Sequence, residues 1–206
     1  TRMQDEVITG IANLIESRDG STGLHVKNTQ NYVQILTKAL REKGMYPDIL
    51  DHNYELNTVK ASVFHDIGKI KTPDAILLKP GRLTDEEFEV MKQHTVAGCE
   101  IIDRIIGNVE HEEYVDIARK IARYHHERWD GTGYPDGLSG EEIPLCARIM
   151  ALADVFDALY QDRCYKKSIR PASKVFEIIK ENSGSQFDPN LTEIFLELQR
   201  ETTDIS

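Results

Sequence analysis

The amino-acid sequence predicts an all-α fold built as one domain. Apolar residues recur at three- and four-residue steps through most of the chain, which is the periodicity of a helix with one buried face. No alternating strand pattern persists, no repeat is evident, and no linker divides the 206 residues. We therefore expect a single helical domain over residues 1–206.

Eight helices account for most of this domain, and loops rich in glycine and proline separate several of them. The clearest helix lies at 85–106, because Thr84 and Glu87 have the spacing of a capping box. Loops are expected at 72–83 and 130–143. The first helix is also compatible with the end of a linker helix, over 1–17, from an upstream sensor or receiver domain. The expected helices are 2–17, 24–42, 55–67, 85–106, 112–126, 144–160, 171–182 and 190–200.

Composition narrows the classes of protein that fit. The chain has 25 Lys and Arg against 35 Asp and Glu, and a formal net charge of −10 argues against a duplex nucleic acid as partner. We expect no membrane segment and a cytoplasmic location, because no apolar run approaches the length of a membrane-spanning helix. Cys99, Cys146 and Cys164 are odd in number and form no CxxC motif, which argues against a disulfide framework and a zinc ribbon.

The histidines and aspartates are the informative polar residues. A single helical histidine is more often a surface or core residue than a metal ligand, so the positions must be considered together. His65 and Asp66 end an apolar helix, where a buried carboxylate requires a partner or a cation. His94 lies on the apolar face of the helix 85–106, three residues after Met91.

Two further segments point polar side chains inward. His125 and His126 are adjacent at the end of a helix, just before the turn-forming segment WDGTGYPDG. Adjacent residues do not share a helix face, so both can serve one site only if it lies at the helix end. Asp154 shares a face with small residues such as Ala147 and Ala151, which leaves space beside its carboxylate.

Four imidazoles and two carboxylates from four helices are difficult to satisfy by hydrogen bonds alone. A metal centre satisfies them together, and ligands without thiolate suit iron, manganese, zinc, cobalt or nickel. Six ligands exceed one tetrahedral site, so two ions bridged by a carboxylate are expected. Two-metal sites hydrolyse phosphate esters well. The predicted ligands are His65, Asp66, His94, His125, His126 and Asp154.

These motifs resemble the HD-GYP branch of the HD-domain metal-dependent phosphohydrolases. HDIGK at 65–69, His94, HHERWDGTGYP at 125–135 and ADVFDAL at 153–159 carry the resemblance, which extends from about residue 10 to residue 197. It implies an HD-domain helical bundle with a binuclear metal site. It also implies hydrolysis of cyclic di-GMP to pGpG, and further to GMP, through attack of a metal-bridging hydroxide, in bacterial second-messenger signalling.

The resemblance also implies roles for individual residues. The six residues named above match the family's metal ligands, with Asp66 as the bridging carboxylate and iron as the expected metal. Lys69 matches a lysine on the scissile phosphate. Arg163 and Lys166 match contacts to the other phosphate, and Tyr134 matches a position at the rim of the site. In this family the GYP loop is also regarded as a docking surface for GGDEF-domain proteins, so the resemblance implies such a protein as a further partner.

Two departures from the family pattern limit these expectations. His25 matches a ligand that some members use for a third metal, but the glutamate usual four residues earlier is replaced by Ser21. We therefore expect two metals, with His25 as a further candidate ligand. Cys164 stands where proline is usual, which affects the expected contacts of Arg163 and Lys166.

Two other functions fit part of the same pattern. One is an HD phosphohydrolase acting on another nucleotide, such as 3′,3′-cyclic GMP-AMP, a dNTP or ppGpp. The other is a weakly active module that binds the dinucleotide for signalling. The sequence leaves open the metal, the choice between cyclic di-GMP and 3′,3′-cyclic GMP-AMP, the final product, the upstream domain and the oligomeric state.

Overall fold

The structure is a computed structural model that describes residues 2–18, 24–107, 112–160 and 172–203. Over these residues the predicted all-α fold is confirmed, and the sole strand-like pairing is an isolated bridge between Ser183 and Phe187. Three short 3₁₀ helices, η1 (Ser62–Phe64), η2 (Ile67–Lys71) and η3 (Gly140–Glu142), interrupt the α-helical pattern. The α-helices of these residues are α1 (Arg2–Arg18), α2 (His25–Glu42), α3 (His52–Ala61), α4 (Asp74–Leu77), α5 (Asp85–Ile106), α6 (Glu112–Tyr124), α7 (Leu145–Tyr160), α8 (Ala172–Glu181) and α9 (Pro189–Thr203).

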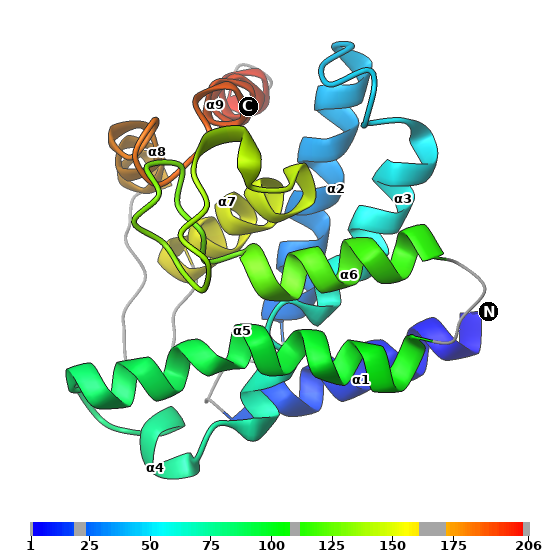
Figure 1. Cartoon of the computed structure of the whole chain (residues 1–206). Coiled ribbons are helices and arrows are strands. Elements are labelled where there is room, and N and C mark those ends of the chain that lie inside the picture. The colour runs from blue at the N-terminus through cyan, green and yellow to red at the C-terminus, as the bar shows by residue number, and fades with distance from the viewer. Residues whose placement is uncertain (1, 19–23, 108–111, 161–171, 204–206) are drawn as a thin grey trace.

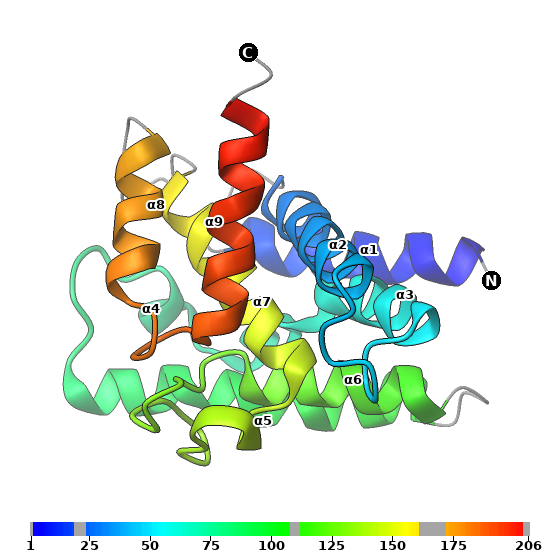
Figure 2. The ribbon, with the colours of Figure 1, turned by 90° about the horizontal axis from the view of Figure 1, so that it is seen from above.

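Helix α2 forms the centre of the bundle, and it packs against α1, α3, α7 and α9. Helices α5 and α6 run alongside each other and pack together, while α8 and α9 lie at the opposite side of α7 (Figures 1 and 2). The short η2 packs against α5. This arrangement brings segments that are far apart in sequence, around residues 65, 94 and 125, to one place inside the bundle.

Large aliphatic side chains from the central helices form the core. Leu36 and Leu40 on α2 are buried, as are Ile121 on α6 and Ile149 and Leu152 on α7. Burying a side chain of this size contributes about 1.5–3 kcal/mol relative to leaving it in water. These contacts give the polar site rigid walls.

The predicted helix at 55–67 is wrong at both ends. Helix α3 begins at His52, because the Asp51 carboxylate accepts a hydrogen bond from the backbone N–H of Tyr54 at 2.7 Å and caps it. The α-helix stops at Ala61, and the chain continues as η1 and η2 with His65 and Asp66 between them. The tighter turns carry the backbone at Gly68 directly against α5, which a continuing α-helix would not do.

The predicted helix at 85–106 is confirmed at both ends, and its capping box between Thr84 and Glu87 is present. The predicted loop at 72–83 contains the single-turn helix α4, and the loop at 130–143 contains η3. Helix α6 ends at Tyr124, two residues earlier than expected, so the adjacent histidines begin the loop. Of the helices described, none is sufficiently long and apolar to span a bilayer.

Candidate metal centre

The segment that contains His65 and Asp66 is fixed by backbone contact with α5. A Cβ atom placed on Gly68 would lie 1.8 Å from the carbonyl oxygen of His94 and 2.6 Å from the amide nitrogen of Gly98. No residue with a side chain can therefore occupy position 68 without moving the two backbones apart. The contact places Asp66 beside His94.

Helix α1 anchors the same segment from the other side. The guanidinium of Arg18 donates hydrogen bonds to the carbonyl oxygens of Lys69, Ile70 and Thr72, at 3.3, 3.3 and 3.4 Å. It also forms an ion pair with Asp74 at 2.6 Å. These contacts hold the last turn of α1 against η2 and so position the residues that α1 directs inward.

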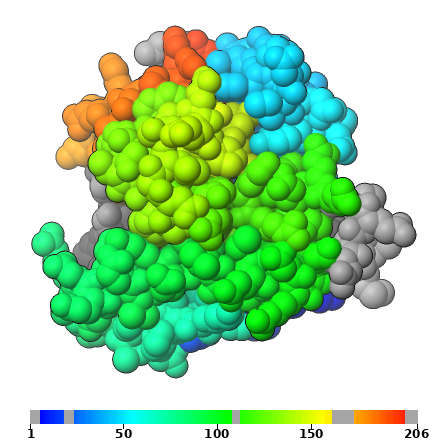
Figure 3. Space-filling model, in the orientation of Figure 1, coloured from blue at the N-terminus to red at the C-terminus, as the bar shows by residue number. Residues whose placement is uncertain are grey.

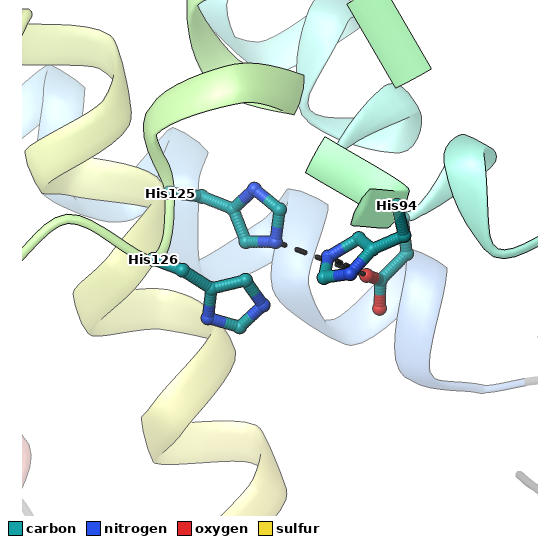
Figure 4. A group of neighbouring side chains, drawn as sticks. His94, His125 and His126 are labelled. Atoms are coloured by element: carbon teal, nitrogen blue, oxygen red, sulfur yellow. Dashed lines mark ion pairs between the residues drawn. The ribbon is translucent and has the colours of Figure 1, made fainter. Parts of the chain in front are cut away.

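Four predicted ligands form one compact cluster, which we call the first cluster: Asp66, His94, His125 and His126. One ligand atom from each lies within 4.8 Å of the others. The Oδ1 atom of Asp66 lies 3.4 Å from Nε2 of His94 and 3.8 Å from Nε2 of His125. Figure 4 shows His94, from α5, facing His125 and His126, which follow the end of α6.

The outer ring nitrogens of these histidines are held by backbone carbonyl groups. Nδ1 of His94 lies 2.7 Å from the oxygen of Met91, and Nδ1 of His125 lies 3.0 Å from that of Ile121. His65 makes the same contact with Ser62 at 2.9 Å. A carbonyl oxygen only accepts, so each Nδ1 carries the proton and each Nε2 presents a lone pair inward.

The inward-facing atoms are buried without hydrogen-bond partners. Nε2 of His65, His94 and His125 and Oδ1 of Asp66 all fall in this class among the described residues. A buried polar atom without a partner costs about 1–3 kcal/mol, and four at one point are exceptional in a folded protein. A cation bound among them removes that cost, so these residues fit a metal ion.

Burial also keeps the imidazole rings neutral, which is the form that can bind a metal ion. It lowers the pKa of His65 and of His94 to about 4, although the Asp66 carboxylate opposes the effect in both. Burial and the neighbouring His125 hold the pKa of His126 well below its usual range. At neutral pH these rings are uncharged, which is the protonation state that binds metals.

A second cluster shares Asp66 with the first and consists of Glu16, His25, His65 and Asp66. Their ligand atoms also lie within 4.8 Å of one another, and all four residues are buried. Nε2 of His25 lies 3.8 Å from Oε1 of Glu16, and Nε2 of His65 lies 3.4 Å from Oδ2 of Asp66. Asp66 is thus placed between two groups of donors, as a bridging carboxylate requires.

Two aspartates of α7 complete the surroundings of His25. Asp154 Oδ1 lies 3.2 Å from its Nε2, and Asp157 Oδ2 lies 2.5 Å from its Nδ1. Burial lowers the pKa of His25, but hydrogen bonds to Asp154 and Asp157 outweigh it and raise the value to about 10. Burial opposes ionisation of Asp154, yet His25 and His65 hold the pKa of its carboxyl well below the usual range.

Lys69 lies beside the shared carboxylate. Its Nζ is 2.6 Å from Oδ2 of Asp66, and its side chain is 15% exposed. Burial opposes ionisation of Asp66, but Lys69 and His65 lower the pKa of its carboxyl well below the usual range. The lysine therefore supplies positive charge at the edge of the cluster, in reach of an anionic ligand.

A cleft of about 310 Å³ opens onto His125 and His126 of the first cluster and onto Asp154. Tyr134 lines it as predicted, with its ring stacked on His126 at a centroid distance of 4.8 Å. The ring of Trp129, in the same loop, packs near Arg148 instead, with its centroid 5.8 Å from the guanidinium carbon. The lining residues are Phe88, Lys92, His125, His126, Glu127, Arg128, Thr132, Gly133, Tyr134, Ala151, Asp154, Val155 and Gln186.

The loop after the paired histidines is fixed by a buried carboxylate. Glu127 is 3% exposed and accepts hydrogen bonds from the backbone N–H groups of Asp136, Gly137 and Leu138 at 2.8, 3.1 and 3.1 Å. A Cβ on Gly133 would lie 2.4–2.6 Å from backbone atoms of residues 126–128. The loop thus folds back onto its own start, beside the metal ligands, at a position that only glycine can occupy without moving the backbone.

The structure brings every described candidate to this site. His65, Asp66, His94, His125 and His126 converge directly. Asp154 lies beside His25 at the second cluster. Lys69 lies beside the shared Asp66, and Tyr134 lines the cleft beside His126. Arg163, Lys166, Ser21 and Cys164 lie outside the described residues.

Sequence reasoning missed three buried carboxylates: Glu16, Glu127 and Asp157. Glu16 is 3% exposed and lies four residues after the buried Ala12, so it occupies the apolar face of α1. That is the same signal that identified His94. Asp157 has an equivalent signal, since it is three residues after Asp154 on α7. Nothing in the sequence distinguishes Glu127 from an ordinary loop glutamate.

Comparisons with known proteins agree with this geometry. A family model described as "HD domain" matches residues 11–191. A cyclic di-GMP phosphodiesterase of Vibrio cholerae is 44% identical over 98% of this chain and 41% of its own length. A cyclic di-GMP phosphodiesterase of Thermotoga maritima is 40% identical over 97% of this chain and 50% of its own length. The V. cholerae 3′3′-cGAMP-specific phosphodiesterase 2 is 36% identical over 93% of this chain and 34% of its own length.

Solved structures show the same fold. A cyclic GMP-AMP-specific phosphodiesterase of V. cholerae superimposes with a TM-score of 0.64 at 18% identity, over 94% of this chain and 48% of that one. An HDG"Y"P protein of Bdellovibrio bacteriovorus superimposes with a TM-score of 0.60 at 16% identity, over 95% of this chain and 62% of that one. The chain spans about half the length of the curated relatives it matches. With its motifs, its helical bundle and its buried histidine–aspartate clusters, the chain belongs to the HD domain family, in its HD-GYP branch.

Proposed function

We propose that this chain is a metal-dependent phosphodiesterase that hydrolyses cyclic di-GMP to the linear dinucleotide pGpG. The observation that carries the proposal is the shared carboxylate of Asp66, which lies within 4.8 Å of the donor atoms of both clusters, while His125 and His126 line an open cleft. Relatives named as cyclic di-GMP and 3′3′-cGAMP phosphodiesterases support the substrate class.

The two clusters have the composition of sites for divalent cations. His94, His125 and His126 would hold one ion, His65 and Asp154 the other, and Asp66 both. Two divalent ions there would activate water and neutralise charge on the phosphoryl oxygens. Mixed imidazole and carboxylate donors suit iron, with manganese, cobalt, nickel and zinc as alternatives.

Glu16 and His25 are the other two members of the second cluster. The expectation of two metals rested on Ser21, which stands where the family usually has a glutamate and lies outside the described residues. Glu16 brings a buried carboxylate to the same histidine from a different element, the last turn of α1. Position 21 alone therefore does not decide how many ions bind, and Glu16 joins the candidate ligands.

The remaining residues hold and orient the substrate. Hydrolysis adds water across one phosphodiester: a bond forms from phosphorus to the water oxygen, the bond to the ribose 3′-oxygen breaks, and that oxygen takes a proton. The Lys69 ammonium, beside Asp66, is positioned to stabilise the added negative charge. Tyr134, stacked on His126, forms a wall of the cleft that limits how the dinucleotide approaches.

Product analysis on anaerobically purified protein tests the proposal. Metal content is measured on the same sample, and the panel contains cyclic di-GMP, 3′,3′-cyclic GMP-AMP, dGTP and ppGpp. We expect pGpG from cyclic di-GMP. Turnover of dGTP or ppGpp alone would assign a different HD phosphohydrolase, and tight binding of cyclic di-GMP by metal-loaded protein without turnover would assign a binding module.

A further inference from the structure

The mouth of the cleft carries an aromatic and a cationic side chain that the steps above do not use. Phe88 and Lys92 lie one turn apart on α5 and both line the cleft. Phe88 is 43% exposed, which is high for a large apolar residue beside a cavity. Figure 3 shows α5 and the segment 128–143 next to each other at the surface, and residues of both line the cleft.

The rings form a continuous wall from the metal ligands to the surface. His126 and Tyr134 are stacked, with 25° between their planes, and the Phe88 ring meets Tyr134 edge to face at a centroid distance of 5.9 Å. Each ring thereby fixes the next. An exposed aromatic ring held in this way is a stacking platform, and a nucleobase stacked on one gains about 1–3 kcal/mol.

Lys92 adds a directional donor to the same wall. Its Nζ lies 5.0 Å from the centroid of Phe88 and 5.6 Å from that of Tyr134, and it forms an ion pair with Glu89 at 2.6 Å. The ring contacts and the ion pair hold the ammonium over the faces of these two rings, where it lines the cleft. An ammonium donates and never accepts. Guanine offers the acceptors O6 and N7 on one edge, whereas adenine replaces O6 with an amino donor.

We propose that Phe88 and Lys92 form a guanine subsite, in which one purine of the bound dinucleotide stacks on Phe88 and its O6 and N7 accept from Lys92. The inference rests on the proposed function and deepens it. Cyclic di-GMP and 3′,3′-cyclic GMP-AMP each provide a guanine for the subsite, whereas cyclic di-AMP provides none.

Steady-state kinetics on purified, metal-loaded variants test the subsite. Phe88→Ala should raise KM for cyclic di-GMP about tenfold and leave kcat within about twofold, and Phe88→Trp should restore KM. Lys92→Ala should lower the preference for cyclic di-GMP over cyclic di-AMP, in kcat/KM, about tenfold. Val90→Ala, on α5 but outside the cleft lining, and Lys38→Ala, on exposed α2 surface, are the matched controls.

Two results would overturn the subsite. The first is that Phe88→Ala and Lys92→Ala behave as their controls. The second is that Lys92→Ala weakens all substrates equally, which would make Lys92 a phosphate contact without base selectivity. Thermal melts establish that each variant is folded.

Direct binding separates this inference from the proposed function. We expect metal-loaded wild-type protein to bind GMP at least tenfold more tightly than AMP by calorimetry, and Lys92→Ala to lose that difference. If the wild type hydrolyses no cyclic dinucleotide yet shows this selectivity, the subsite stands and the phosphodiesterase assignment falls. Equal binding of GMP and AMP by the wild type would overturn the subsite whatever the turnover.

Discussion

The two clusters that share Asp66 differ in how many carboxylates lie around their histidines. In the first, burial lowers the pKa of His94 and of His126, and Asp66 is the one carboxylate among the cluster's four residues. In the second, three carboxylates, those of Glu16, Asp154 and Asp157, lie around His25. The first cluster is therefore ready to bind a cation, whereas in the second a proton on His25 occupies the place of one.

Removing the shared carboxylate of Asp66 should affect both clusters at once. Asp66→Ala takes one ligand from each cluster, so we expect loss of both ions and a fall in kcat/KM of at least about 10³. Mass spectrometry of bound metal and turnover of cyclic di-GMP measure the two effects. Asp116→Asn, on the exposed face of α6, is the control. Asp66→Ala protein with normal metal content would refute the bridging role.

Substitutions on one side only should separate the clusters. His94→Ala should lose the ion of the first cluster, and Glu16→Gln should lose or weaken the ion of the second, because each removes a ligand that the other cluster does not contain. Metal stoichiometry at limiting free metal is the measurement. Glu6→Gln, at an exposed position of α1, controls for the change of charge. Loss of the same ion in both variants would contradict two separate sites.

The pH dependence of metal binding should differ between the clusters. In metal-free protein His25 keeps its proton up to a pKa of about 10, so an ion that binds its Nε2 must displace that proton. Its affinity should rise about tenfold per pH unit, or about a hundredfold from pH 7 to 9. His94 has a pKa of about 4, so the first ion's affinity should be flat over that range. Metal-buffered titrations distinguish the two; equal slopes would contradict the prediction.

The stability of the metal-free protein should follow the same groups. His65 and His94 have a lowered pKa of about 4, so the unfolded chain binds more protons between pH 4 and 6.5, and stability rises with pH there. His25 has a raised pKa, so its contribution is complete below about pH 6.5 and is lost as the pH rises through 10. Thermal melts should show a maximum near pH 6.5, and His25→Ala should remove the decline above it.

The smallest effect should come from the residue that orients His25. Asp157→Asn keeps the shape of the side chain but weakens its hold on Nδ1, so we expect about a tenfold loss of affinity for the second ion and no change for the first. The same metal titrations measure it. An equal loss at both clusters would show that Asp157 acts on the packing of α7 rather than on the histidine.

Much of the fold and of the candidate site was predictable from local patterns. The boundaries of α5 follow from a capping box and an apolar face, and the placement of His125 and His126 at a helix end follows from the turn residues after them. The 3₁₀ turns around His65 and Asp66 were not predictable, because they depend on contact between Gly68 and the backbone of His94 on α5, 26 residues further along the chain. Glu16 lies on the apolar face of α1, which the sequence could have shown, but its place beside His25 depends on how the last turn of α1 docks against η2.

The contact at Gly68 has a consequence for how this centre tolerates change. The separation between Asp66 and His94 is set by two backbones that touch, not by the side chains of the surrounding core. Sequence drift in that core can alter stability while the spacing of the ligands stays constant. Position 68 itself has no such tolerance, because the methyl group of Gly68→Ala would lie 1.8 Å from the carbonyl oxygen of His94 and would change the ligand spacing directly.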